Sequence, residues 1–332
     1  MRRGSIFRIS LYGLAAAGAV TLVALLIQWL PDSASVQMNR ITDVYWFTTA
    51  ICIGIFGVVA GVIAYSVIHF RAQPDDDSDG PPIHGHTGIE IVWTIIPFIL
   101  VIAIGTYSAV VLSENGRAGT NPMHIRVFAQ QFAWNFKYPS EKNLTSTELV
   151  VPVHRNIRFE LQAADVIHSF WVPEWGQKQD AVPGIATHID VTPTRTGRFT
   201  LICTELCGLG HATMRAPVRV VTAAEFAAWV KKQQQGAGAG GAGAAGFTNS
   251  GCGSCQTFTP AGSKGQIGPD LDNLAADAKK AGVPLDQYIK DSIVDPDKYI
   301  VPGYQKGVMP TNFGQSLGQQ GVQALVQYLQ RS

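Results

Sequence analysis

The chain lacks an excess of charge of either sign: Lys and Arg together number 25, Asp and Glu 24, and the formal net charge is +1. A nearly neutral chain gives no electrostatic reason to expect a nucleic-acid partner. Charged residues are also scarce, at 15% of the 332 residues, against 46% hydrophobic ones. Because soluble domains average about 25% charged residues, this scarcity predicts long apolar segments.

Histidine and cysteine are sparse as well, with eight and five residues, and no histidine follows His211. Cys52 lies inside an apolar run and is expected to pack as a small hydrophobic side chain. The other four cysteines form two close pairs, at positions 203 and 207 and at positions 252 and 255. Such pairs in a chain with few other cysteines indicate metal, redox or cofactor chemistry rather than a disulfide framework.

The apolar runs lie in the first third of the chain. Residues 1–32 have a basic start and a long apolar stretch, so we expect either a secretory signal peptide or an extra membrane helix. Two further runs, about 44–70 and 91–112, are each long enough to cross a bilayer core of about 30 Å. They predict a transmembrane hairpin over 40–113. A basic N-terminus on the inner side places the loop 71–88 inside and the rest of the chain outside.

The pattern changes over residues 120–232, where short runs rich in Val, Ile, Thr and aromatic residues alternate with Pro and Gly. This spacing predicts an all-β sandwich or barrel, closed by a short helix over 223–232. Residues 233–246 are rich in Gly and Ala and predict a flexible linker. Residues 247–332 are expected to form a small domain. Its last segment predicts an amphipathic helix, with apolar residues at Val322, Leu325, Val326 and Leu329.

The run Cys203-Thr-Glu-Leu-Cys207-Gly-Leu-Gly-His211-Ala-Thr-Met214 places two thiols, an imidazole and a thioether within twelve residues. These are soft and borderline ligands, which suit copper and zinc. A Cys-x3-Cys pair alone is more often a disulfide or a zinc site than a copper site. Structural zinc sites close with Cys and His, however, and blue copper takes one thiolate, so the thioether and second thiolate favour a two-metal copper site. We expect the second imidazole from His168, in the run His168-Ser-Phe-Trp.

Together these residues resemble the binuclear copper (CuA) site of cytochrome c oxidase subunit II, and the resemblance covers roughly residues 40–232. It implies a cupredoxin-like copper domain. The implied ligands are His168, Cys203, Glu205, Cys207, His211 and Met214. Cys203 and Cys207 would bridge two coppers, and Glu205 would contribute its backbone carbonyl. The carboxylate of Glu205 would also reach a magnesium ion at the boundary with the catalytic subunit.

Two other segments resemble the same family. Gly88-Ile-Glu90-Ile-Val-Trp93 resembles the start of its second membrane helix, which implies that Glu90 lies at the mouth of a proton channel in the catalytic subunit. An ordinary carboxylate at a helix N-terminus is the alternative. Gln130-Gln-Phe132-Ala-Trp134 resembles the aromatic strand that receives an electron from cytochrome c. Many members have tryptophan where this chain has Phe132, whereas Trp134 is kept.

The resemblance implies a subunit at which electrons from cytochrome c enter a haem-copper terminal oxidase. They would pass through the copper pair to haem in subunit I, where oxygen is reduced to water and protons are pumped. This chain would carry electron transfer and no oxygen chemistry. Its expected surroundings are the bacterial plasma membrane, with the copper domain on the outer face, and its partners subunit I, other oxidase subunits and cytochrome c. A membrane-tethered copper chaperone or thiol-redox assembly protein, a quinol oxidase subunit and a nitrous oxide reductase fit the pattern less well.

The tail run Cys252-Gly-Ser-Cys255-Gln256 resembles the haem attachment motif of c-type cytochromes, Cys-x2-Cys-His, and Met309 resembles their axial methionine. This implies a small all-α cytochrome c-like domain fused to subunit II, as in caa-type oxidases. Gln256 stands in place of the motif histidine, so the iron of a haem c would lack its proximal ligand. Three interpretations stay open. The domain could have lost its haem and carry a disulfide between the two cysteines, it could bind a haem in an unusual way, or the two thiols could form a redox-active pair.

Overall fold

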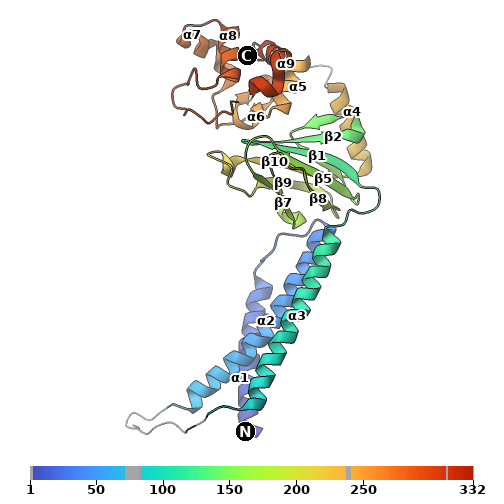
Figure 1. Ribbon diagram of the computed structural model, residues 1–332, viewed down its shortest axis with the longest axis vertical. Helices are drawn as coiled ribbons and strands as arrows, with labels where there is room; N and C mark the ends of the chain where they lie inside the picture. The colour runs from blue at the N-terminus through green and yellow to red at the C-terminus, as the bar shows by residue number, and fades with distance from the viewer. Residues whose placement is uncertain (1–2, 72–81, 83, 237–240, 312, 332) are drawn as a thin grey trace. The chain divides into compact units, whose positions relative to one another are not determined.

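The computed structural model describes residues 3–71, 82, 84–236, 241–311 and 313–331. The chain divides into two compact units. The first comprises Met1–Ser33 and Asn39–Asn115, and the second comprises Ala34–Met38 and Gly116–Ser332. Figure 1 labels the helices and strands of both units.

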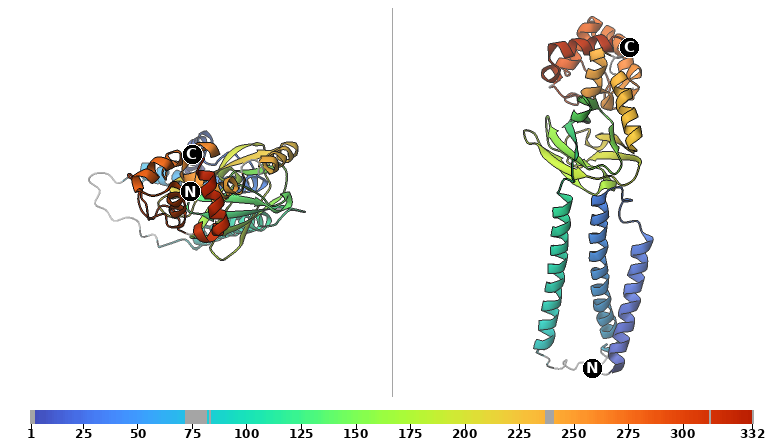
Figure 2. Two further views of the ribbon diagram at one scale, coloured as in Figure 1. Left: turned by 90° about the horizontal axis from the view of Figure 1, so that it is seen from above. Right: turned by 90° about the vertical axis from the view of Figure 1, so that its right-hand side faces the viewer.

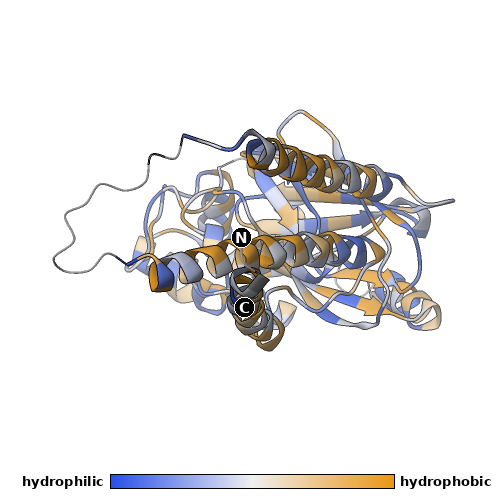
Figure 3. Ribbon diagram, turned by 90° about the horizontal axis from the view of Figure 1, so that it is seen from below, coloured by the Kyte–Doolittle hydropathy of each residue, from blue (hydrophilic) through white to orange (hydrophobic). Residues whose placement is uncertain are grey.

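The described part of the first unit is formed by three long helices, α1 (Arg3–Leu26), α2 (Val36–His69) and α3 (Thr87–Asn115). At about 1.5 Å per residue they are roughly 36, 51 and 44 Å long, more than the roughly 30 Å of a bilayer core. Each is long and apolar enough to cross a membrane. Their large apolar side chains are mostly exposed, and Figure 3 shows the hydrophobic colour along the helices. Such surfaces are suited to lipid or to partner helices.

Glycines bring α1 and α2 into close contact. A Cβ atom on Gly13 would lie 2.7 Å from the carbonyl oxygen of Gly57, and one on Gly61 would lie 2.6 Å from that of Ile9. Small residues allow membrane helices to approach in this way. Two side-chain hydrogen bonds join the same helices, from Tyr65 to Ser5 at 2.9 Å and from Arg8 to His69 at 3.0 Å. This packing favours the membrane-helix expectation for residues 1–32.

The second unit contains a sandwich of two five-stranded sheets, with strand orders β3-β2-β1-β5-β8 and β4-β10-β9-β6-β7. In β1 the side chains alternate between buried and exposed, because successive residues of a strand point to opposite faces. The strands are β1 (Met123–Gln130), β2 (Ala133–Tyr138), β3 (Leu144–Ser146), β4 (Leu149–Pro152), β5 (Ile157–Ala163), β6 (His168–Trp171), β7 (Lys178–Ala181), β8 (Thr187–Val191), β9 (Gly197–Cys203) and β10 (Arg215–Val221).

The pairing of the strands decides where the candidate metal ligands lie. β1 pairs with β5 and β4 with β10 in parallel, and the remaining pairs of the sandwich are antiparallel. β6 pairs with β9 so that Phe170 lies opposite Cys203. This register brings the start of β6, where His168 lies, beside the end of β9. The expected all-β, cupredoxin-like domain is confirmed.

The rest of the second unit is mainly helical, as Figures 1 and 2 show. The first of these helices, α4 (Ala223–Gly236), packs on the core of the sandwich through Phe226 and Trp229. The later helices pack around a separate apolar core that contains Phe247, Phe258, Ile289, Leu325 and Leu329. The amphipathic helix expected at the C-terminus is confirmed. The elements are α4 (Ala223–Gly236), α5 (Gly241–Asn249), α6 (Cys252–Cys255), β11 (Thr257–Phe258), β12 (Ser263–Lys264), α7 (Leu274–Ala281), α8 (Leu285–Val294) and α9 (Phe313–Leu329).

The expected flexible linker over 233–246 requires a correction, because α4 continues to Gly236 and α5 begins at Gly241. A Cβ atom on Gly243 would lie 2.1 Å from the carbonyl oxygen of Ala324 and 2.5 Å from Cβ of Tyr328. The small residues therefore allow α5 to pack tightly against α9, and a Gly- and Ala-rich composition alone does not distinguish this role from a tether. Residues 237–240 of the expected linker lie outside the described residues.

Other boundaries differ by a few residues. The membrane helices expected over 44–70 and 91–112 begin earlier, at Val36 and Thr87. The expected starts were taken from the apolar runs, and each helix begins with polar residues that precede its run. Most of the expected inner loop 71–88 lies outside the described residues.

Candidate metal centre

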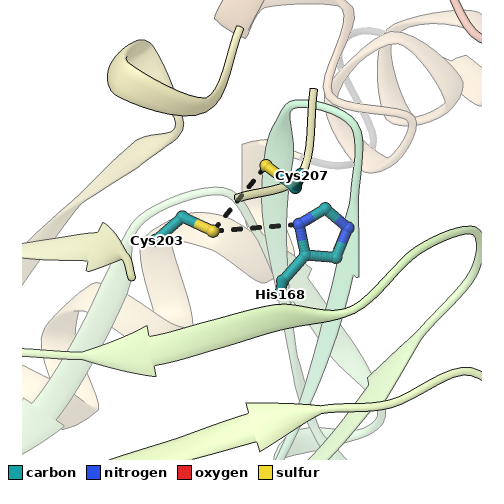
Figure 4. A group of neighbouring side chains, drawn as sticks. All are labelled: His168, Cys203 and Cys207. Atoms are coloured by element: carbon teal, nitrogen blue, oxygen red, sulfur yellow. Dashed lines mark hydrogen bonds between the residues drawn. The ribbon is translucent and has the colours of Figure 1, made fainter. Parts of the chain in front are cut away.

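The metal-ligand candidates come from two neighbouring places in one sheet. His168 begins β6, Cys203 ends β9, and Met214 immediately precedes β10. The backbone N–H of Cys203 donates to the carbonyl oxygen of Met214 at 3.1 Å, which closes the base of the loop between β9 and β10. Figure 4 shows the side chains of His168, Cys203 and Cys207 turned towards one another. The sheet thus holds both ends of the loop, and the loop presents the sulfurs.

The two sulfurs are placed to share metals. Sγ of Cys203 lies 3.8 Å from Sγ of Cys207. This distance is far longer than the roughly 2.05 Å of a disulfide bond. It is shorter than about 4.6 Å, twice a metal–thiolate bond of roughly 2.3 Å, so one ion can touch both sulfurs. Both cysteines are buried and unpaired, which leaves their thiols available as ligands.

The other expected donors surround this sulfur pair. Nδ1 of His168 lies 3.9 Å from Sγ of Cys203, and the carbonyl oxygen of Glu205 lies 3.3 Å from the same atom. Nδ1 of His211 and Sδ of Met214 lie 3.6 Å and 3.7 Å from Sγ of Cys207. The structure therefore brings all six residues together, two donor atoms beside each sulfur, with one imidazole on each side. The donor set fits a pair of soft or borderline metal ions.

The thiols differ in acidity. Burial, the largest influence, would raise the pKa of Cys203, but hydrogen bonding with His168 and with backbone groups outweighs it and lowers this pKa to about 6. Burial and then the neighbouring charge of Cys203 raise the pKa of Cys207 to about 12. Cys203 therefore ionises readily, and its negative charge disfavours ionisation of Cys207. A cation between the sulfurs removes that opposition, because metal binding displaces protons from its ligands.

Asp165 fixes the orientation of His168, and the sequence interpretation missed it. Its Oδ1 lies 2.8 Å from Nε2 of His168. The same carboxylate accepts the backbone N–H groups of Gln131 and Val166, each at 2.7 Å. Burial would raise the pKa of Asp165, but these hydrogen bonds outweigh it and keep this pKa below its ordinary value. With Nε2 engaged by Asp165, Nδ1 faces the sulfurs. A carboxylate three residues before a candidate ligand was the available signal.

The β1–β2 turn supports the loop from one side. The Nε2–H group of Gln131 donates to the carbonyl oxygen of Cys207. A Cβ atom on Gly210 would lie 2.5 Å from Cδ2 of Phe132, so the loop lies directly against this ring. The ring of Trp134 meets that of His168 edge-on, with 6.1 Å between the centroids. Phe132 and Trp134, the residues expected to receive the electron, are thus both buried against the metal-ligand candidates.

Two expected residues lie at other places. Glu90 is in the first turn of α3, and its Oε1 accepts the backbone N–H of His86 at 3.0 Å, as a helix-capping carboxylate does. The side chain of Glu205 is exposed, although its backbone oxygen lies at the sulfur pair. Neither carboxylate contacts another candidate ligand through a described interaction.

In the tail, Cys252, Cys255 and Met309 line one cavity of about 130 Å³, together with Gln256. The two cysteines are not joined in a disulfide. Two thiols and a thioether match the attachment and axial positions of a c-type haem, but no histidine is present after position 211 of the sequence. Gln256 offers a neutral amide where the haem iron needs an imidazole. The residues present therefore do not fit a complete c-type haem site.

A helix-anchored, cupredoxin-type domain in which one loop presents two thiols, an imidazole and a thioether beside a second imidazole from β6 defines a membrane-bound copper electron-transfer protein. Two family models match the chain: "Cytochrome C oxidase subunit II, transmembrane domain" over residues 23–111 and "Cytochrome C oxidase subunit II, periplasmic domain" over residues 141–221. The chain belongs to the cytochrome c oxidase subunit 2 family. It is a membrane protein, and electrons enter a haem-copper terminal oxidase at this subunit.

Relatives support this assignment. The chain is 30% identical over 248 residues to cytochrome c oxidase subunit 2 of Synechocystis sp., covering 60% of this chain and 74% of the relative. It is 30% identical over 282 residues to the protein of the same name from Thermostichus vulcanus, covering 68% of this chain and 86% of the relative. A crystal structure of the periplasmic domain of subunit II (CoxB) of Bradyrhizobium japonicum is 32% identical, with a TM-score of 0.35, and covers 36% of this chain and 98% of that one. The assignment rests on the sequence relatives and the family models.

Proposed function

We propose that His168, Cys203, Glu205, Cys207, His211 and Met214 hold a binuclear copper centre that accepts single electrons from cytochrome c. The 3.8 Å separation of the sulfurs of Cys203 and Cys207 is the observation that carries this proposal. Two coppers held by these residues would supply a one-electron relay whose charge is shared between both metals. The electrons then pass to haem in subunit I, where oxygen reduction is coupled to proton pumping.

The protein's own residues keep this relay rigid and dry. The side chains of His168 and Met214 are fully buried and those of both cysteines nearly so, which excludes water from these four ligands, whereas His211 is half-buried. Asp165 holds one imidazole, and the hydrogen bond between Cys203 and Met214 holds the loop ends. Ligands that are fixed by a surrounding shell need little rearrangement when the charge at the site changes.

Electron delivery is proposed to pass the turn between β1 and β2. Phe132 lies against the metal loop, and Trp134 lies edge-on to the imidazole of His168. Both rings thus give short packed routes to the ligands. The exposed side chains of Leu206 and Leu209 flank Cys207 on the same loop. Exposed large apolar residues next to a functional site are suited to contact with a partner protein, and we assign them to the contact with other oxidase subunits.

The test uses the assembled oxidase, with copper analysis and near-infrared and electron paramagnetic resonance spectra. Two coppers per chain, in addition to the copper of the haem-copper centre in the catalytic subunit, and a mixed-valence signal are expected from the six ligands. Met214→Leu should alter the signal, because it removes one donor at 3.7 Å from Sγ of Cys207. Met123→Leu, at a buried methionine of β1, is the matched control and should leave the spectra unchanged. A single zinc ion, or one copper with a mononuclear spectrum, would overturn the proposal.

Glu205 and Glu90 are proposed to serve the boundary with the catalytic subunit. The exposed Glu205 carboxylate, two residues from Cys203, is assigned to a magnesium ion there, since Mg²⁺ prefers oxygen ligands. Manganese substituted for magnesium in the assembled oxidase should lose its resonance signal in Glu205→Gln. Glu90 is assigned to the mouth of a proton channel. Glu90→Gln keeps an oxygen that can accept from His86 but removes the ionisable group, so slower proton uptake with an intact helix supports the channel role.

The tail is proposed to be a cytochrome c-like domain fused to subunit II. Its support is the order of landmarks, with a Cys-x2-Cys turn, a later methionine at the same cavity and a terminal helix in the core. A complete haem c site is not expected, because Gln256 stands where the motif histidine would bind the iron. We propose that the fold is kept without the full haem ligation.

A further inference from the structure

The tail touches the sandwich at the turn between β1 and β2. Gln130 and Ala133 are paired in register where the two strands meet at this turn. The Nε2–H group of Gln130 donates to the carbonyl oxygen of Ser250 at 2.7 Å. A Cβ atom on Gly251 would lie 2.4 Å from Cβ of Ala133. Both strand residues therefore contact the tail segment 250–255, which includes α6 and is called the docking segment below.

The burial of Ala133 comes from this contact. Successive residues of a strand point to opposite faces of the sheet, and Trp134 lies in the core of the sandwich, so Ala133 faces outwards. Its side chain is nevertheless only 2% exposed, and it belongs to neither of the two apolar cores. An outward side chain of a strand is buried only when something covers the sheet, and here the docking segment covers it.

The docking segment also reaches Phe132, the ring proposed to pass the electron. Cys255 packs against the core of the sandwich, whereas Cys252 packs against the core of the tail. The backbone N–H of Phe132 forms a hydrogen bond with the sulfur of Cys255. Phe132 is 5% exposed and lies against Gly210 of the metal loop. The same residue is thus in contact with the metal loop and with the tail.

This contact has a consequence for a donor that arrives from solution. Electron transfer slows steeply as the distance between the two centres grows, so a soluble cytochrome c must bring its haem close to the entry turn. The tail does not offer a complete haem c site, because Gln256 replaces the motif histidine. A docked segment without such a cofactor adds distance between the donor haem and Phe132 and supplies no redox centre to bridge it.

We propose that the docking segment covers the β1–β2 turn and thereby slows the delivery of electrons by a soluble cytochrome c. The contact with Gln130, Phe132 and Ala133 makes the tail an internal partner of the surface that an external donor would use. This inference rests on the proposed function, since it takes the β1–β2 turn as the place where electrons enter. It also gives the tail fold a role that requires no haem.

The test compares Gly251→Asn with Gly262→Asn in the assembled full-length oxidase. Both glycines have a left-handed backbone, with φ of 69° and 68°, which Asn adopts more readily than most side chains. A Cβ atom at position 251 meets Ala133, whereas one at position 262 meets nothing within 4 Å, so Gly262→Asn is the matched control. The clash should shift the balance from docked to undocked tail by about 5- to 150-fold, the range that overpacking corresponds to.

Alkylation of the cysteines, followed by mass spectrometry, measures this release. Cys255 packs on the sandwich, so it should react faster in Gly251→Asn than in the wild type or the control. Cys252 packs in the core of the tail, so it should keep its wild-type reactivity while the tail stays folded. If Cys252 also reacts faster, the tail has unfolded. The turn is then uncovered as well, and the expected change in electron entry is the same.

Stopped-flow reduction of the binuclear centre, followed in the near infrared, measures electron entry. With reduced soluble cytochrome c the rate should rise several-fold in Gly251→Asn and keep its wild-type value in Gly262→Asn. Ascorbate-reduced tetramethylphenylenediamine is a small donor that does not need the whole turn, and it should give equal rates in all three proteins. Its rate therefore separates access to the turn from a change in the centre itself.

Three results would overturn this proposal: a reactive Cys255 with an unchanged or lower rate from cytochrome c, a Cys255 that stays protected in Gly251→Asn, or an equal gain with the small donor. Copper content and the mixed-valence spectrum are measured on the same samples. Their absence from the wild type would instead overturn the proposed function, so the two failures are distinguishable.

Discussion

Nε2 of His168 lies 2.8 Å from Oδ1 of Asp165, and this contact decides which nitrogen of the ring faces the sulfurs. A histidine that binds a metal through one nitrogen commonly donates its other N–H to a carboxylate. Here the carboxylate is itself held by two backbone N–H groups. The imidazole is thus oriented by hydrogen bonds within the protein.

The first prediction follows from this contact. Asp165→Asn keeps the shape of the side chain but removes its charge, so the hold on His168 weakens. We expect copper affinity to fall by about 10- to 100-fold, the usual cost of losing such a partner. Chelator competition on the assembled oxidase measures the change. Glu160→Gln, which removes surface ion pairs with Arg126 and His124, should leave the affinity unchanged. Equal affinities in the two variants would contradict the role of Asp165.

A second prediction concerns the contact between the metal loop and Phe132. Gly210→Ala places a methyl group 2.5 Å from Cδ2 of that ring, so the loop or the ring must shift. We expect a loss of about 1–3 kcal/mol in the free energy of unfolding, as overpacking costs, and a changed copper spectrum. Phe132→Leu in the same chain should recover part of both. Gly105→Ala, which meets nothing within 4 Å, is the control and should stay near neutral.

The third prediction concerns α1. Its antiparallel contacts with α2 pair Ser5 with Tyr65, Ile9 with Gly61 and Gly13 with Gly57. We expect α1 to remain in the mature chain, and intact-mass measurement of the purified subunit should include it. Gly61→Leu should separate the helices and reduce cross-linking between them, whereas Gly54→Leu, where a Cβ meets nothing within 4 Å, should not. A mature chain that begins near residue 30 would refute this expectation.

A fourth prediction uses the missing imidazole. Gln256→His restores the Cys-x2-Cys-His motif in a chain that keeps both cysteines and Met309 at one cavity. Produced with the cytochrome c maturation machinery, the full-length variant should show a covalent haem spectrum, whereas the wild type should show none. Gln305→His, at another glutamine of the same cavity, is the control and should stay without haem. A haem spectrum in the wild type would show that Gln256 does not prevent attachment.

Much of the fold was predictable because its signals are local. Apolar runs long enough for a bilayer predicted α2 and α3, and the period of Val322, Leu325, Val326 and Leu329 predicted the terminal helix. The helix boundaries were less accurate, because polar residues continue the helices beyond the apolar runs. The Gly/Ala segment was misread as a tether because its partner, Ala324, is more than eighty residues away in the chain. The composition of a segment does not reveal which distant residues it contacts.

The candidate centre was predictable for a different reason. Five of its six residues are in or beside one loop, and their residue types restrict the chemistry. Their close spacing in the sequence was therefore enough to identify them as one group of candidate ligands. His168 was expected from its sequence run as the second imidazole, and the pairing of β6 with β9 explains how it reaches the loop. Gln131 was missed because its hydrogen bond to the loop depends on how the strands bring distant residues together, which the sequence does not display. Asp165 was missed although its position three residues before His168 was a local signal.

The hydrogen bond between Cys203 and Met214 has a consequence for the length of the loop that it closes. Because β9 and β10 hold the two ends of this loop, the sheet fixes the positions of Cys203 and Met214. An insertion or deletion between them would displace Cys207 and His211 while leaving both ends in place. The number of residues in the loop, more than the identity of its exposed side chains, is therefore what the sequence must preserve.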